Sequence, residues 1–169
     1  MTLIERLERL EKQLLKPRRF RETIEHNKEL LDKHVTGTYK VNSDGTIDVS
    51  GSVKLLMLDL GSILKVGKFN TVSGDFDCRS NKLETLEGAP KSTGGFFSCS
   101  NNNLTTLKFA PETVGANFDC SKNKLTSIEG CPKSVGNTFT ITGQKSTRQF
   151  KVKDVLSLCK VDKAKVFTD

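Results

Sequence analysis

Cysteines are the residues of this chain best suited to chemistry, because a thiol can bind a metal ion or take part in redox reactions. Three of the five, Cys78, Cys99 and Cys120, stand 21 residues apart. On neighbouring strands, about 4.8 Å apart, their thiols would form a ladder. Each follows a phenylalanine by two residues, and alternation along a strand then points both side chains inward. We therefore predict that these thiols pack as small hydrophobic groups, and we assign no role to Cys131 or Cys159.

Other patterns that could carry catalysis are weak. His26 and His34 lie eight residues apart on a predicted helix without a second pair of metal ligands. The segment 136–146 contains Gly-Gln-Lys-Ser, but its spacing does not fit a phosphate-binding loop. The sequence has neither a G-x-S-x-G nor an H-E-x-x-H motif, and no nucleophile stands beside a base. We expect no enzymatic activity, no cofactor and no metal.

The cysteine spacing belongs to a repeat of 21 residues, and a fixed period of this size is typical of a solenoid. The repeated positions are Phe76, Phe97 and Phe118; Asn81, Asn102 and Asn123; Leu83, Leu104 and Leu125; Leu86, Leu107 and Ile128; and Pro90, Pro111 and Pro132. The apolar skeleton is that of a leucine-rich repeat, with Phe and Cys in the first two leucine places. The asparagine is expected to turn the chain and to bind open backbone groups in its own and the neighbouring coil. Proline and glycine favour an extended return rather than a helix.

The predicted fold is therefore an α+β repeat solenoid, a short leucine-rich-repeat stack with parallel strands over residues 53–143. Residues 53–69 read as a degenerate first repeat, and Phe139 and Ile141 begin a fourth copy that lacks the asparagine. Residues 144–169 form a basic C-terminal cap with a short helix and a closing strand. Such a cap is needed because a solenoid must cover its last apolar layer.

The N-terminal third is predicted to be helical and then to form a hairpin. Residues 1–16 read as a heptad helix with a stripe of Leu3, Leu7, Leu10 and Leu14. Helices under ~12–15 residues are marginal alone, so this stripe packs either within the chain or on the same helix of another subunit. Residues 17–52 contain a second helix, from Arg19 to about His34, and an N-terminal cap with a hairpin turn at Asp44–Gly45.

The segment Gly-Asp-Phe-Asp-Cys-Arg-Ser-Asn-Lys-Leu-Glu-Thr-Leu-Glu-Gly-Ala-Pro-Lys-Ser, at residues 74–92, resembles the leucine-rich repeat proteins of tailed bacteriophages, whose role is mostly unassigned. The lead-in at residues 42–53 is also similar to that group, and the resemblance covers roughly residues 38–143 and the helix-strand ending. It implies a viral protein that acts in the cytoplasm of a bacterial host. It carries over no catalytic residue. The first residues do not form a signal peptide, so we also expect a cytoplasmic protein with reduced thiols.

The candidate site is the outward face of the parallel strands, because solenoids of this kind bind through the strand surface. Phe96 stands in a column whose other members are polar, and we expect it to be an exposed anchor unless it folds over the strand or meets a cap. Aspartates form an acidic cluster beside Arg79. The partner-binding residues predicted on this face are Asp75, Asp77, Arg79, Phe96, Ser98, Ser100, Asn117 and Asp119.

Net charge is +7, and the last 32 residues carry 7 Lys/Arg against 3 Asp/Glu. The leading hypothesis is a non-catalytic protein-binding module that inhibits or adapts a host or viral protein and can oligomerise through the N-terminal helix. The alternatives are nucleic acid binding through Lys145, Arg148, Lys151 and Lys153, or a structural part of the virion. No apolar run in the sequence is long enough to span a membrane.

Overall fold

The computed structural model describes residues 28–162 and 165–169, and the chain divides into two compact units, residues 1–33 and 34–169. Residues 28–34, the described end of the predicted second helix, are helical. The heptad helix expected over residues 1–16 and the start of the second helix lie outside the described residues. The remaining description concerns the second unit.

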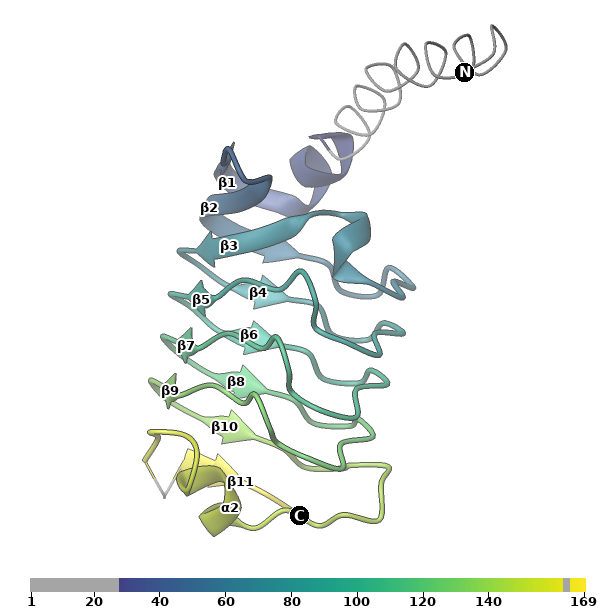
Figure 1. Ribbon diagram of the computed structural model, residues 1–169, viewed down its shortest axis with the longest axis vertical. Helices are drawn as coiled ribbons and strands as arrows, with labels where there is room; N and C mark the ends of the chain where they lie inside the picture. The colour runs from purple at the N-terminus through teal and green to yellow at the C-terminus, as the bar shows by residue number, and fades with distance from the viewer. Residues whose placement is uncertain (1–27, 163–164) are drawn as a thin grey trace, which may run out of the picture. The chain divides into compact units, whose positions relative to one another are not determined.

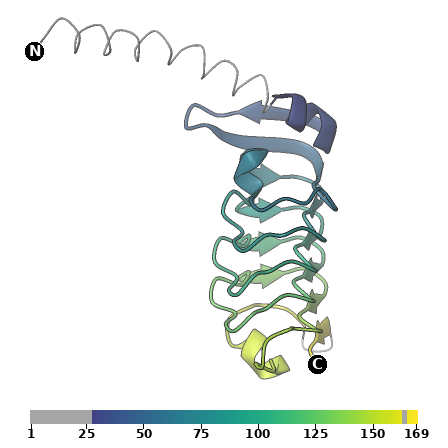
Figure 2. The same cartoon turned by 90° about the vertical axis from the view of Figure 1, so that its right-hand side faces the viewer.

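The second unit is a parallel-strand solenoid of about 5 turns, which confirms the predicted repeat solenoid (Figure 1). Each coil contributes one short strand to each of two ladders, and Figure 2 shows the coils stacked edge on. The first ladder contains β2 (Thr46–Lys54), β4 (Phe76–Asp77), β6 (Phe97–Ser98), β8 (Phe118–Asp119), β10 (Phe139–Thr140) and β11 (Val166–Phe167). The second contains β2, β3 (Lys68–Val72), β5 (Ser92–Thr93), β7 (Thr113–Val114) and β9 (Ser134–Val135). The extended return expected from proline and glycine thus includes a second row of strands.

Glycine makes the corner between the two ladders. A side chain at Gly94 would place its Cβ 2.1 Å from the carbonyl oxygen of Ser73 in the preceding coil, and Gly115 and Gly136 meet the coil before them at the same distance. Only a residue without a Cβ allows this approach. The glycine that closes each sequence repeat therefore sets the tight stacking of the corners.

The repeated apolar positions form the core, as predicted. Phe76, Phe97, Phe118 and Phe139 pair in register along the first ladder and are fully buried. The rings of Phe76 and Phe97 stack at 5.4 Å, and those of Phe97 and Phe118 at 5.7 Å. The three cysteines of the repeat are also fully buried, which confirms their inward direction. Leucines of the following positions fill the layer behind them: Leu83, Leu86, Leu104, Leu107 and Leu125.

Buried asparagine side chains tie each coil to its neighbour. The Asn102 amide nitrogen donates to the carbonyls of Cys78 in the preceding coil (3.0 Å) and Cys99 in its own coil (3.1 Å). Its side-chain oxygen accepts from the backbone N–H of Leu83 at 3.0 Å. Asn81 and Asn123 make equivalent bonds. The predicted role of this residue is confirmed.

Gln144 holds the asparagine position in the last copy, 21 residues after Asn123. Its amide nitrogen donates to the carbonyls of Cys120 (3.0 Å) and Ile141 (3.2 Å), and its oxygen accepts from the N–H of Leu125 at 3.1 Å. The longer side chain thus replaces the asparagine that the sequence lacks there.

Both ends of the solenoid are covered. At the start, β1 (Val35–Val41) pairs antiparallel with β2 across the predicted Asp44–Gly45 turn. The first coil is degenerate as expected: Val53 pairs with Phe76, 23 residues on, and a short 3₁₀ turn, η1 (Ile63–Lys65), follows. At the other end come α2 (Val152–Leu156) and β11, which extends the ladder parallel to β10.

Candidate functional site

The predicted partner-binding residues lie on the outward side of the first ladder, but much of this face is closed. Asp77 and Ser98 are paired neighbours on β4 and β6, and they and Ser100 are buried. Phe96, which we expected to be exposed, is half-buried. Small side chains in rows set by the strand spacing cover one another, so outward direction does not give exposure here. Whether these residues bind a partner remains a prediction.

Polar groups on this face are largely used in interactions within a coil or between neighbouring coils. Asp77 accepts from Arg79 Nε at 3.2 Å, and burial raises the pKa of Asp77 although Arg79 opposes the shift. Asp75 Oδ1 accepts from the backbone N–H of Phe96 in the next coil at 3.0 Å. The side-chain oxygen of Asn117 accepts from Asn137 (2.8 Å), and Asp119 accepts from the N–H of Ser121 (2.9 Å).

The thiols of the repeat offer little reactivity. Burial raises the pKa of Cys78, Cys99 and Cys120 well above the ordinary value, which disfavours the reactive thiolate. Cys131 is half-buried and its pKa is raised to about 11. Within the described residues, no group of three or more His, Cys, Asp or Glu side chains is placed to hold a metal ion.

Phe109 is the unusual residue of the solenoid. Its side chain is 60% exposed, and its φ of +67° lies in the left-handed region. Gly88 and Gly130 hold the same position in the coils on either side, with φ of +96° and +82°. A residue with a Cβ costs roughly 1–2 kcal/mol in this conformation, and an exposed ring recovers little of that by burial. Sequence analysis missed Phe109, although the 21-residue period itself aligns it with two glycines.

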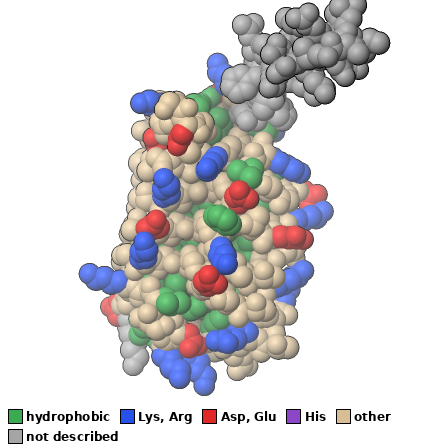
Figure 3. Space-filling view, in the orientation of Figure 1, with side chains coloured by type: hydrophobic (Ala, Val, Ile, Leu, Met, Phe, Trp, Pro, Cys, Tyr) green, Lys and Arg blue, Asp and Glu red, His purple; other side chains and the backbone are tan. Residues whose placement is uncertain are grey.

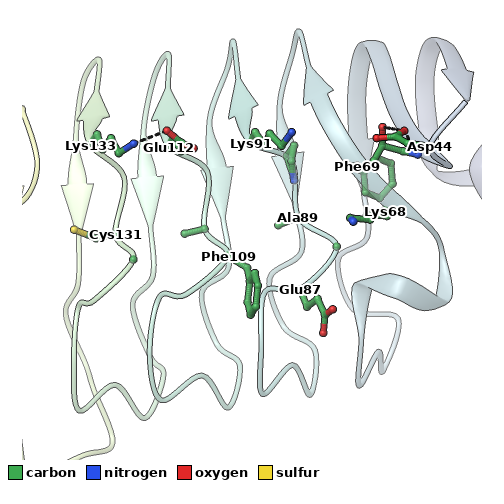
Figure 4. A pocket seen from close by; sticks show the side chains of 15 residues that line it. Asp44, Lys68, Phe69, Glu87, Ala89, Lys91, Phe109, Glu112, Cys131 and Lys133 are labelled. Carbon is green, nitrogen blue, oxygen red and sulfur yellow. Dashed lines mark hydrogen bonds and ion pairs between the residues drawn. The ribbon is translucent and has the colours of Figure 1, made fainter. Parts of the chain in front are cut away.

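An open groove with a volume of about 530 Å³ runs beside Phe109, over the return segments of successive coils (Figure 4). We call the segments 87–91, 108–112 and 129–133 the Phe109 face. Apolar residues of this groove include Phe69, Ala89, Pro90, Ala110 and Cys131. A second hollow of about 450 Å³ shares Gly130, Cys131 and Lys133 and continues to Phe150 and Leu158, which is 53% exposed.

Charged side chains form two columns on the Phe109 face, one on each side of Phe109, and all of them are exposed. The first column is Glu87, Lys108 and Glu129; the second is Lys91, Glu112 and Lys133. Figure 3 shows acidic and basic side chains alternating on this surface, with hydrophobic side chains between them. Within the columns, Lys133 pairs with Glu112 at 2.6 Å and Lys108 with Glu129 at 3.5 Å. Each coil thus carries one acidic and one basic residue four positions apart.

The four basic residues of the nucleic acid alternative are all exposed: Lys145, Arg148, Lys151 and Lys153. The Arg148 guanidinium lies over the ring of Phe150 at 5.5 Å, at the edge of the second hollow. The backbone of Lys151 donates to Asp154 at the start of α2. Binding of nucleic acid by these residues remains a prediction.

Comparisons with protein families, with curated sequences and with solved structures found no match to this chain. No helix among the described residues has the length and apolar character that a membrane span requires. The site must therefore be interpreted from its own geometry.

Proposed function

We propose that this chain is a non-catalytic protein-binding module and that the Phe109 face is its contact surface. The observation that carries the proposal is a strained and exposed aromatic residue where the neighbouring coils have glycine. Left-handed backbone at a residue with a side chain persists where the surrounding structure enforces it, and such positions gather at functional sites. Aromatic side chains, phenylalanine included, are also enriched in protein interfaces.

The surroundings of Phe109 suit a protein partner. The groove is shallow and open, its base is apolar, and exposed charges border it on both sides. An apolar centre with a charged rim is the usual anatomy of a protein interface. A small-molecule site is more enclosed and buries most of its ligand.

The repeat pattern supports the finer proposal of a leucine-rich-repeat protein of the kind found in tailed bacteriophages. On that basis the partner is a host or phage protein in the bacterial cytoplasm, and the chain acts as its inhibitor or adaptor. The predicted strand-face residues from Asp75 to Asp119 form a second surface of the same module. The alternative functions are nucleic acid binding through the basic C-terminal segment and a structural role in the virion.

Affinity purification from infected bacteria tests the proposal with a pair of matched variants. Phe109→Gly removes the exposed ring and relaxes the backbone. Met57→Gly is the control, because Met57 is 75% exposed with a φ of +56° and does not line the groove. We expect the first variant to lose a partner that the second retains. Equal recovery with both variants would contradict the proposal.

A nucleic acid binder would behave differently in a direct binding assay. Binding through phosphate contacts weakens steeply with salt, and replacing Lys145, Lys151 and Lys153 by Gln would reduce that dependence. Binding that resists salt and needs Phe109 favours the protein-binding module.

A further inference from the structure

Building on the proposed function, we infer that the partner of the Phe109 face is a second copy of this chain. The two solenoids lie parallel and face to face, related by a two-fold axis that runs along the solenoid direction. This arrangement follows from the signs and order of the exposed charges. It leaves the strand face, on the first ladder, open for a further partner.

The two charge columns are complementary to each other, coil by coil. In every coil, two charged residues four positions apart have opposite signs, one directly before the position of Phe109 and the other three places after that position. The pairs are Glu87 with Lys91, Lys108 with Glu112, and Glu129 with Lys133. A two-fold axis along the solenoid places the first column of one copy against the second column of the other. All contacts between columns are then between opposite charges.

A two-fold axis perpendicular to the solenoid, within the same interface and centred on the Phe109 coil, gives the reverse result. It places each column against itself in the opposite direction. Lys91 would face Lys133, and Glu112 would face Glu112 of the other copy. Like charges opposed across an interface are strongly unfavourable. Moving this axis to a point between two coils restores opposite charges, but only two coils of each copy are then opposed, with four contacts in place of six. The charge order therefore favours the parallel dimer, in which all six charges are paired.

Ion pairs within each chain do not account for this order. The Lys133–Glu112 and Lys108–Glu129 pairs explain why signs alternate along each column. They do not fix the sign of one column relative to the other, since no ion pair between described residues joins the two columns. In three successive coils the two columns carry opposite charges at the same level. Pairing with a parallel copy requires this arrangement.

The apolar strip between the columns completes the interface. Ala110 lines the groove and stands midway in sequence between Lys108 and Glu112, so we place the two-fold axis close to this residue. Each Phe109 ring then packs over Ala110 of the other copy, and Gly88 and Gly130, which present no side chain, hold the same position in the coils on either side. The strained ring thereby becomes buried by association, which provides the burial that the single chain lacks.

Mass measurement on the full chain tests the inference. Sedimentation velocity over a concentration series should give twice the 18.7 kDa chain mass at low salt, with weaker association at high salt. Phe109→Gly should weaken the dimer by about tenfold or more, and Met57→Gly should not. A wild-type chain that stays monomeric at every concentration would overturn the inference.

Mixing two charge-reversed chains tests the parallel geometry. Lys108→Glu alone and Glu112→Lys alone each create two like-charge contacts in their own dimer, so each should associate about tenfold more weakly than the wild type. An equimolar mixture restores opposite charges at both contacts. We expect it to dimerise as well as the wild type, and failure of the mixture to recover would contradict this arrangement.

The leucines of residues 1–16 provide the control for another route to a dimer. Leu7→Glu with Leu10→Glu in the full chain should leave the face-to-face dimer intact. A dimer lost in this variant but unaffected by Phe109→Gly would overturn the inference. A monomeric chain that still loses a foreign partner on Phe109→Gly would leave the proposed function standing. If Phe109→Gly changed neither dimerisation nor the recovery of a foreign partner, both this inference and the proposed function would be wrong.

Discussion

The column of Asn102 and the column of Phe109 both run along the solenoid with the same period, but only the first keeps its residue type. The asparagines are repeated without change and are replaced by Gln144 at the end, where the same backbone groups must be satisfied. The other column reads Gly88, Phe109 and Gly130, and its irregular member carries an exposed aromatic ring. Folding therefore explains the first column and does not explain the second.

This contrast separates what holds the coils together from what the surface presents. Asn123 is fully buried and bonds two neighbouring coils, so an apolar substitution leaves the Leu104 N–H without its acceptor and removes a bond between the coils. Phe109 makes no hydrogen bond with its side chain and remains in water. The left-handed backbone at Phe109 destabilises the single chain, so we infer that the exposed ring serves an interaction with another molecule.

The largest expected effect is on the asparagine column. Asn123→Leu should lower the free energy of unfolding by about 3–5 kcal/mol, because the Leu104 N–H loses its acceptor and three carbonyls each lose one of their donors. Urea unfolding followed by circular dichroism measures this. Gln144→Leu, at the half-buried end of the same column, should cost less. Equal losses of stability on Asn123→Leu and Gln144→Leu would contradict the distinction between central and terminal coils.

A smaller loss is expected in the cysteine column. Cys99→Ser places a hydroxyl among fully buried apolar groups and should cost about 1–3 kcal/mol, whereas Cys99→Ala should cost less. Thermal unfolding compares the two variants. A serine variant more stable than the alanine variant would show that this position prefers a polar group, against its interpretation as core packing.

The glycine-aligned column gives effects of opposite sign. Gly130→Ala should destabilise the fold by about 1–3 kcal/mol, because its φ is positive and the new Cβ would lie 2.7 Å from Lys108 Cα. Phe109→Gly should stabilise the monomer by about 0.5–1 kcal/mol, since it relieves left-handed strain. Chemical unfolding of dilute protein measures both. A less stable Phe109→Gly monomer would mean that the ring supports folding, and the comparison of columns would fail.

The smallest effect concerns pH and lies away from both columns. Asp48 accepts hydrogen bonds from Thr71, Asn42 and Asn70, which lower its pKa from 3.8 to about 2. A carboxylate with a lowered pKa contributes stability above its unfolded pKa and loses it as the pH falls. Melting temperatures between pH 5 and 2 should fall less steeply for Asp48→Asn than for the wild type. Identical slopes would contradict this role.

Much of the solenoid could be predicted because its 21-residue period can be recognised in the sequence. Phe97, Cys99 and Leu104 alternate or recur in ways that only a stacked coil satisfies, and Asn102 follows at the point where the strand must turn. The second ladder was less visible, since its strands β5, β7 and β9 lie between the proline and the glycine of each repeat, which indicate an irregular or extended return. Gln144 was also missed because it serves the same bonds with a different residue type.

The site was harder to predict than the fold. Asp77 and Ser98 point outward as the alternation requires, yet they are buried, because exposure depends on what neighbouring coils cover. The binding surface expected on the strand face was therefore chosen by direction alone. Phe109 was readable from the period in principle, but a phenylalanine in an apolar-rich repeat suggests core packing until its backbone conformation is known.

By itself, the sequence determined the parallel solenoid, its buried columns, and the hairpin and strand at its two ends, because periodic burial and turn chemistry are local and repeat along the chain. Only the tertiary structure decided that the Phe109 ring is exposed in a left-handed conformation and that both charge columns are exposed beside one groove. These properties belong to surfaces assembled from coils 21 residues apart. They depend on how the return segments align in space, which residue types alone do not specify.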